Sequence, residues 1–222
     1  MKTNQDYKNA SLAALQGNWV PAVLATLIYL AIAMVLSGAN EIPSSAGKLA
    51  SPFNWLSGVS AVAMVFVVFP LQYGFSNAMR FLYERQDTAL VENQFRIPLN
   101  HYFRSVWVML LVAVKTFLWA LLLIIPGIIK SFAYSMAPYI AEDHPEYTVS
   151  QAISESCRMM EGHKFDLFYL YLSFIGWFLL SIISCGIGFL WLQPYVENAV
   201  AAFYNDLKAQ SGDGIKDATI VG

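Results

Sequence analysis

The stretch "LLLIIPGIIKSFAYSMAPYIAEDHP", Leu121–Pro145, decides the fold because it looks like one membrane span interrupted at its middle. A run of leucine and isoleucine meets Pro126 and Gly127, and a second apolar run follows. Proline lacks a backbone N–H and disfavours helix for the residue before it, while glycine adopts positive φ without strain. Residues 105–141 are too long for one span, since crossing the hydrocarbon takes about 20 helical residues. We therefore predict two spans joined by a tight turn at Pro126-Gly127.

The basic residues favour this turn over the alternative, a single helix kinked at Pro126, which would move the following loop across the membrane. With the turn, the basic residues that fall on one side are Lys2, Lys8, Arg80, Arg85, Arg96, Arg104, Arg158, Lys164, Lys208 and Lys216. Only Lys48 and Lys130 fall opposite, and Lys115 lies within a span. Because basic residues accumulate in cytoplasmic loops, we expect both termini in the cytoplasm.

The composition is that of a membrane protein. Of 222 residues, 57% are hydrophobic and only 13% are charged, whereas a soluble domain carries about 25% charged residues. A formal net charge of −2 argues against a nucleic-acid partner. The two cysteines form neither a CxxC pair nor a disulfide framework, and no motif calls for a cofactor. Membrane lipids are the expected partners, and the sequence leaves a protein partner or a homo-oligomer open.

The predicted fold is all-α: a polytopic membrane helix bundle with six transmembrane helices and interfacial amphipathic helices. The spans lie at about residues 19–36, 56–80, 106–125, 128–141, 166–184 and 186–204, within one integral membrane domain, residues 1–207. Residues 208–222 are polar and are predicted to form a flexible cytoplasmic tail. The first apolar run is longer than a signal-peptide core of about 7–15 residues, so we expect it to remain as a span.

Amphipathic stretches precede the span pairs. In "TVSQAISESCRMMEG", Thr148 and Gln151 predict a capping box and Gly162 a helix stop. "LNHYFRSV" follows Pro98, which we place at a helix start, and "YKNASLAALQGNW" is a weaker third copy. We expect these helices to lie along the cytoplasmic headgroup layer, and the alternative is that they pack on one another as a small cap.

The chain thus consists of three units, each with one interfacial helix and two spans. Within them, "LQYGFSNAMRFLY" (residues 71–83) and "LQPYVENAVAAFY" (residues 192–204) share Leu, Gln, Asn, Ala and Tyr in register. This match predicts an internal repeat.

Two ionisable residues inside predicted spans are the candidate functional residues, because such residues are costly in a membrane. Lys115 and Glu197 both lie roughly 10–12 Å from the cytoplasmic ends of their spans, at a rise of about 1.5 Å per residue. Equal depth and opposite charge predict an ion pair in a polar cavity. The other polar residues expected around it are Gln72, Asn77, Gln193 and Asn198. In the alternative, Lys115 extends towards the cytoplasmic interface.

No stretch predicts catalysis or a metal site. "EGHKFD" and "EDHPE" combine histidine with carboxylates, but neither has the paired histidines of HExxH, and both lie at expected interfacial helix ends. We therefore expect a protein that is not an enzyme.

Three runs carry a family resemblance: "IIPGIIKSFAYSMAPYI", "GHKFDLFYLYLSFIGW" and "GIGFLWLQPYVENAVAAFY". Over roughly residues 105–207 the chain resembles the bacterial membrane family catalogued as domain of unknown function 975. In that family an acidic residue often stands where Tyr171 is here. The resemblance implies an integral membrane protein without an assigned activity, and it supplies no catalytic residues.

We therefore expect a multi-pass protein of the bacterial cytoplasmic (inner) membrane that binds or transports a small or lipid-like solute. The alternative is a structural or regulatory subunit whose interfacial helices engage a partner or the bilayer. A cavity around Lys115 and Glu197 would favour transport, and a dry, packed bundle would favour the alternative.

Overall fold

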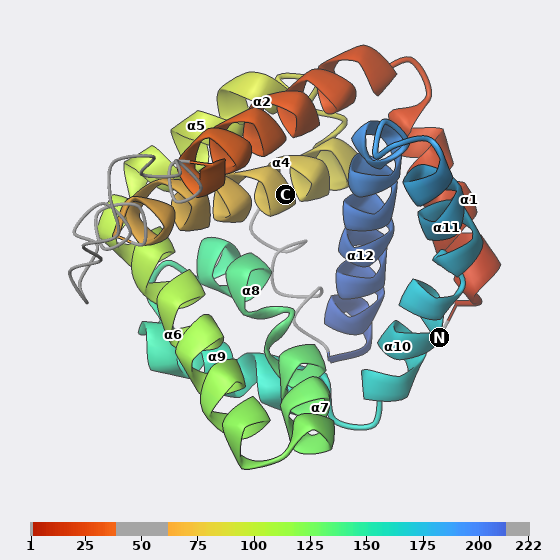
Figure 1. Ribbon diagram of the computed structural model, residues 1–222. Helices are drawn as coiled ribbons and strands as arrows, with labels where there is room; N and C mark the ends of the chain where they lie inside the picture. The colour runs from red at the N-terminus through yellow and green to blue at the C-terminus, as the bar shows by residue number, and fades with distance from the viewer. Residues whose placement is uncertain (1, 39–61, 212–222) are drawn as a thin grey trace, which may run out of the picture.

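The computed structural model describes residues 2–38 and 62–211, and the regular elements in these ranges are all helical (Figure 1). In chain order they are α1 (Asn4–Leu15), α2 (Trp19–Gly38), the π-helical turn η1 (Met64–Val68), α4 (Phe69–Arg85), α5 (Leu90–Asn100), α6 (Tyr102–Leu122), α7 (Ile124–Tyr134), α8 (Ala137–Asp143), α9 (Val149–Met159), α10 (Lys164–Leu172), α11 (Ile175–Ile183) and α12 (Phe189–Ser211). The all-α prediction is confirmed for this part of the chain.

Three segments are long and apolar enough to cross a membrane: Trp19–Leu36, Tyr102–Leu122 and Lys164–Ile183. They correspond to the first, third and fifth predicted spans. Only 17%, 17% and 22% of their residues are buried inside the protein, so their apolar side chains face outward, as lipid contact requires. These segments indicate a membrane protein. The start of the second predicted span, residues 56–61, lies outside the described residues.

The chain reverses between α6 and α7, but the reversal is at Leu123 and not at Pro126-Gly127. Leu123 is extended, with φ −160° and ψ 138°, between the two helices. Pro126 lies in the first turn of α7, where a missing N–H is harmless because the first N–H groups of a helix have no intrahelical acceptor. Gly127 allows α7 to pass close to α6, since a Cβ there would lie 2.6 Å from Cα of Ala120. The predicted turn residues therefore belong to the helix that follows.

Two further predicted boundaries were wrong. The fourth predicted span, residues 128–141, is divided between α7 and the short α8. Residues 208–211, predicted as the start of the flexible tail, continue α12 to Ser211, and the rest of that tail lies outside the described residues. The predicted tight connection between α11 and α12 is confirmed, because Cys185 and Gly186 both have positive φ, 54° and 87°.

The short helices α1, α5 and α9 pack on α12, α4 and α8, respectively. The predicted amphipathic stretch "LNHYFRSV", residues 99–106, forms no helix of its own and runs from the end of α5 into α6. Each of these helices therefore buries one face against a core helix, and its place along the headgroup layer stays a prediction. The capping box of Thr148 and Gln151 is confirmed at the start of α9. Pro98 lies inside α5, not at a helix start, and deprives the Gln94 carbonyl of its usual helical donor. Gly74 of α4 approaches this carbonyl so closely that a Cβ would lie 2.0 Å from its oxygen.

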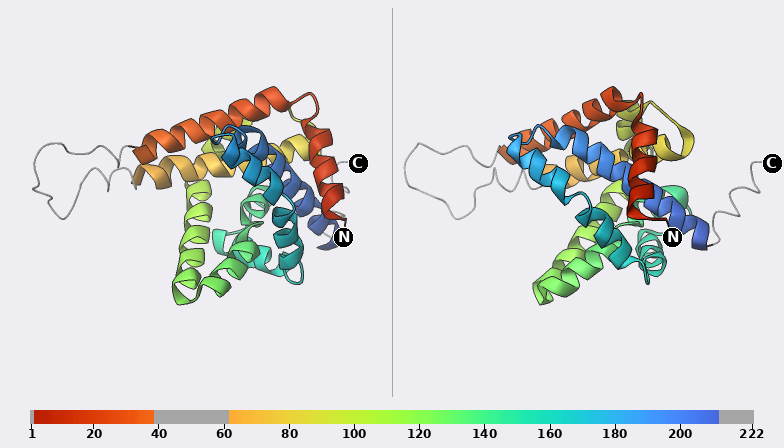
Figure 2. Two further views of the ribbon diagram at one scale, coloured as in Figure 1. Left: turned by 45° about the vertical axis from the view of Figure 1, so that its right-hand side comes forward. Right: turned by 90° about the vertical axis from the view of Figure 1, so that its right-hand side faces the viewer.

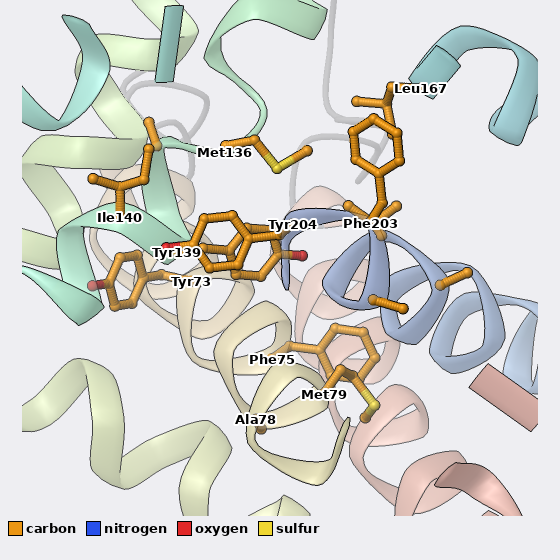
Figure 3. Close-up of a cluster of buried hydrophobic side chains, with 14 of the residues drawn as sticks. Tyr73, Phe75, Ala78, Met79, Met136, Tyr139, Ile140, Leu167, Phe203 and Tyr204 are labelled. Carbon is orange, nitrogen blue, oxygen red and sulfur yellow. The ribbon is translucent and has the colours of Figure 1, made fainter. Parts of the chain in front are cut away.

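The core lies where α4, α8 and α12 meet, while α2 lies over α4 and the α6–α7 hairpin projects away from them (Figures 1 and 2). Figure 3 shows core side chains from all three helices: Tyr73, Phe75, Tyr139, Ile140, Phe203 and Tyr204.

Two asparagines in matching positions of the predicted repeat join these core helices. Asn77 of α4 donates through Nδ2 to the Pro138 carbonyl of α8 at 3.3 Å. Asn198 of α12 donates through Nδ2 to the Met79 carbonyl of α4 at 3.0 Å. Both side chains are fully buried. Residues 71–83 and 192–204 thus match in register, and in both segments the shared asparagine donates a hydrogen bond from one core helix to a backbone carbonyl of another.

Candidate functional site

Glu197 of α12 lies where the core helices meet, and its carboxylate accepts hydrogen bonds from three neutral groups. From α4, Gln72 Nε2 donates to Oε1 at 3.2 Å and Ser76 Oγ donates to Oε2 at 3.0 Å. From α8, the Tyr139 hydroxyl donates to Oε2 at 3.3 Å. We call Glu197, Gln72, Ser76 and Tyr139 the carboxylate cluster. It draws on all three core helices.

The predicted ion pair between Lys115 and Glu197 does not form. Among the described residues, no lysine, arginine or histidine makes an ion pair with Glu197. Lys115 is on α6, and α8 lies between α6 and α12 (Figure 1). Equal depth along two helices does not make them neighbours, which is why the prediction failed.

The structure divides the other predicted polar residues between two roles. Gln72 belongs to the carboxylate cluster, while Asn77 and Asn198 make the bonds between core helices. The Oδ1 atoms of both asparagines are buried without a hydrogen-bond partner in the described structure. Gln193, one turn before Glu197, is partly buried and takes no part in the hydrogen bonds of the cluster.

A second polar cluster, which sequence reasoning missed, is centred on Arg80 of α4. This side chain is fully buried and forms ion pairs with Asp143 at the end of α8 and with Glu84, the latter at 3.4 Å. The other Asp143 oxygen accepts from the Tyr204 hydroxyl at 2.8 Å and from Lys208 Nζ at 3.1 Å. We call these five residues the arginine cluster. Its sequence signal is an arginine with Met79 and Phe81 on either side, for which the charge distribution predicts only a cytoplasmic position.

The geometry of the arginine cluster explains the charge state of Asp143. Burial alone would raise the pKa of this carboxyl, but the charges of Arg80 and Lys208 and the hydrogen bonds from Tyr204 and Arg80 outweigh it, so the pKa lies below its ordinary value. The carboxylate is therefore ionised near neutral pH. Two of the Arg80 nitrogens, Nε and the second terminal nitrogen, are buried without a partner in the described structure.

Arg104, at the start of α6, fixes the end of α8 that presents Asp143. Its guanidinium donates to four carbonyls that follow one another around the end of this helix, those of Ala141, His144, Pro145 and Tyr147, at 2.6–3.0 Å. Carbonyls at a helix C-terminus lack intrahelical donors and carry partial negative charge. A guanidinium there supplies the missing hydrogen bonds and balances the charge.

A pair of tyrosine rings connects the two clusters. Tyr139, which donates to Glu197, stacks on Tyr204, which donates to Asp143, with ring centroids 5.2 Å apart and planes 28° apart. Figure 3 shows the two rings lying side by side between α8 and α12. A displacement of either ring would therefore change the hydrogen bonds to both carboxylates.

An apolar groove of about 510 Å³ lies between α1, α2, α11 and α12. We call it the tryptophan groove because Trp19, Trp177 and Trp191 line it, together with Leu12, Leu180, Ser181, Ser184, Ile187, Gly188, Leu192 and Tyr195. The serine hydroxyls in its wall are bonded internally: Ser181 donates to the Trp177 carbonyl and Ser184 to the Ser181 carbonyl, at 2.8 and 2.9 Å. The groove thus presents mainly hydrocarbon and aromatic surface.

One family model matches the C-terminal part of the chain. Residues 121–211 match the model of the family described as "Protein of unknown function (DUF975)". This match confirms the family resemblance from residue 121 onward, and it covers Tyr139, Asp143 and Glu197 but not the α4 residues that bind them. No curated protein and no solved structure matches the chain.

Proposed function

We propose that this protein, a member of that family through residues 121–211, is a non-enzymatic, multi-pass protein of the bacterial inner membrane that binds or moves a lipid-like solute. It would cross the membrane six times with both termini in the cytoplasm. The three apolar candidate spans and the one-sided distribution of basic residues support this arrangement.

The tryptophan groove is the observation that carries the proposal. Its volume of about 510 Å³ is within the range of about 300–1,000 Å³ typical of small-molecule sites. Its walls include α2 and α11, which are parts of candidate spans, so the groove is continuous with surface that faces lipid. Trp177 and Leu180 on this wall are 55% exposed each.

The chemistry of the groove selects its occupant. Because the wall serines already use their hydroxyls on backbone carbonyls, a polar solute would lose its hydration without gaining equivalent hydrogen bonds. A hydrocarbon chain loses nothing comparable, and it gains contact with the aromatic side chains. The proposed occupant is therefore the acyl chain of a membrane lipid or fatty acid.

Photo-crosslinking with a fatty acid that carries a diazirine on its chain tests this function. In the purified protein, labelled peptides should map to the groove residues of α11 and α12, and Leu180→Trp should reduce the labelling several-fold by filling the groove. Leu179→Trp is the matched control, because Leu179 is also 55% exposed but does not line the groove. Labelling spread evenly over the candidate spans, and equal in both variants, would refute the proposal.

The alternative function, a structural or regulatory subunit that engages the bilayer through its interfacial helices, is favoured by one surface of α5. Phe95 and Leu99 on this helix are 38% and 65% exposed. A spin label at Leu99→Cys should then be relaxed by oxygen dissolved in lipid, and a label at Glu92→Cys by a water-soluble reagent. Equal access to water at both positions would argue against this role.

A further inference from the structure

We propose that Glu197 is a proton-binding site that exchanges its proton within the membrane domain. The juxtaposition that carries the inference is one carboxylate held by three neutral donors from α4 and α8 and by no cation among the described residues. This site goes beyond the lipid-binding function proposed above and does not depend on it.

The contrast with Asp143 shows what is missing at Glu197. Both carboxylates are partly buried beside the core, and both accept a tyrosine hydroxyl. Asp143 also receives Arg80 and Lys208, so its negative charge is balanced. At Glu197 the remaining donors are an amide and a serine hydroxyl, which orient the carboxylate but do not neutralise it.

The side chains that donate to Glu197 in the part of the chain that the structure describes are all formally neutral. Gln72 and Ser76 come from α4, and Tyr139 from α8. Among the described residues, Tyr29 of α2 and Tyr171 of α10 are further titratable groups that interact with its charge. A proton is therefore the simplest source of the balancing charge, and it comes from and returns to water as Glu–COO⁻ + H₃O⁺ ⇌ Glu–COOH + H₂O.

Two opposing effects make both charge states accessible. Low polarity in the membrane interior favours the neutral acid, since an unpaired charge there is costly. The three hydrogen bonds favour the carboxylate, because an ionised carboxylate is the stronger acceptor. A residue held between these effects can change its charge when either the pH or the hydrogen bonding changes.

Protonation would alter the packing of all three core helices. The protonated oxygen becomes a donor and loses part of its acceptor capacity, so a group that now donates to it can turn to another acceptor. Gln72 Nε2 already lies 3.4 Å from Ser76 Oγ, which offers such an acceptor. Tyr139 is stacked on Tyr204, and a shift of Tyr139 would therefore extend to the arginine cluster.

Infrared spectroscopy of the purified protein tests the site directly. Between about pH 5 and about pH 9, around the range in which perturbed carboxyls titrate, the wild type should lose the carbonyl stretch of a protonated carboxylic acid as pH rises. Glu197→Gln should lack this band. Glu142→Gln should keep it, although Glu142 also accepts a tyrosine hydroxyl bond, from Tyr73 at 2.9 Å.

A second pair of variants separates a titrating site from a structural carboxylate. Ser76→Ala and Gln72→Leu each remove a donor to the carboxylate, so the band should persist to a pH higher by about one unit, a tenfold change in proton affinity. A titrating band that is retained in Glu197→Gln, or a wild type with no such band, would overturn the proposal. Loss of the band on adding sodium chloride at constant pH would also overturn it, in favour of a metal-cation site.

Discussion

At the residue scale, Arg80 illustrates how a buried charge depends on one partner. Its side chain is fully buried and its firmest contact is the ion pair with Asp143. The net stability contribution of such a pair is small, because both groups lose their hydration. Removing one partner is different, since the other charge then remains buried and uncompensated. We therefore expect the pair to act mainly by specifying how α4, α8 and α12 fit together.

This argument predicts a large effect for Asp143→Ala. The variant should lose about 3–5 kcal/mol of stability, the usual cost of leaving a buried charge unpaired. Thermal unfolding in detergent measures the loss. Glu155→Ala is the matched control, because Glu155 pairs with Arg158, whose side chain is 61% exposed, and should cost less than about 1 kcal/mol. Similar losses in the two variants would show that Arg80 does not depend on Asp143.

The same carboxylate predicts a pH dependence. Its pKa in the folded protein lies below the ordinary value, so its contribution is complete above the unfolded value of about 3.9 and is lost as pH falls through the folded value. The melting temperature of the wild type should therefore approach that of Asp143→Asn as pH drops below about 4. A difference between the two proteins that is constant down to about pH 2 would contradict this assignment.

At the element scale, the α6–α7 hairpin depends on one close contact. Gly127 is helical, so helix propensity alone would favour alanine there. Its place against Ala120 overrides propensity, because a Cβ would lie 2.6 Å from the Ala120 Cα and 2.8 Å from its Cβ. Only a displacement of one helix could accommodate the extra methyl group.

Gly127→Ala should therefore destabilise the protein by about 1–3 kcal/mol, as overpacking of a close contact does. Gly176→Ala provides the control within the same protein, since a Cβ at this helical position meets nothing within 4 Å. It should stabilise the protein by about 0.5–1 kcal/mol through helix propensity. Thermal unfolding measures the change in stability of both variants. A change of the same sign in Gly127→Ala and Gly176→Ala would mean that the contact between α6 and α7 is not tight.

Sequence reasoning succeeded for elements whose signal is local. The apolar run of residues 19–36, the capping box at Thr148 and the glycine-rich connection after α11 are all read from neighbouring residues, and all are present. It failed at Leu123, because a short reversal between two apolar runs has no special composition. It also failed for Lys115, Arg80 and Ser76, because which helices touch is decided by packing across the whole chain.

At the scale of the whole molecule, one order of elements recurs three times, as the sequence predicts, but the second unit begins at α5 and not at residues 99–106. Each begins with a short amphipathic helix, α1, α5 or α9, and continues into two longer helical stretches. The second stretch of each unit supplies one core helix, α4, α8 or α12, and the carboxylate and arginine clusters both lie where these meet. A change at either cluster therefore bears on all three units together.

The two native cysteines test how this assembly crosses the membrane. Cys157 lies in α9 and Cys185 in the connection between α11 and α12, and the candidate span Lys164–Ile183 separates them. In the proposed topology Cys157 faces the cytoplasm and Cys185 the opposite side. A membrane-impermeant maleimide should then label Cys185 in right-side-out vesicles and Cys157 in inverted ones.

Single variants, Cys157→Ser and Cys185→Ser, assign each labelled site, and labelling after denaturation corrects for the partial burial of Cys157. Because only one candidate span lies between the two cysteines, opposite labelling requires that this segment cross the membrane once. Labelling of both from the same side would mean that α10 and α11 enter and leave on one face. The six-span topology, and with it the cytoplasmic position of both termini, would then have to be abandoned.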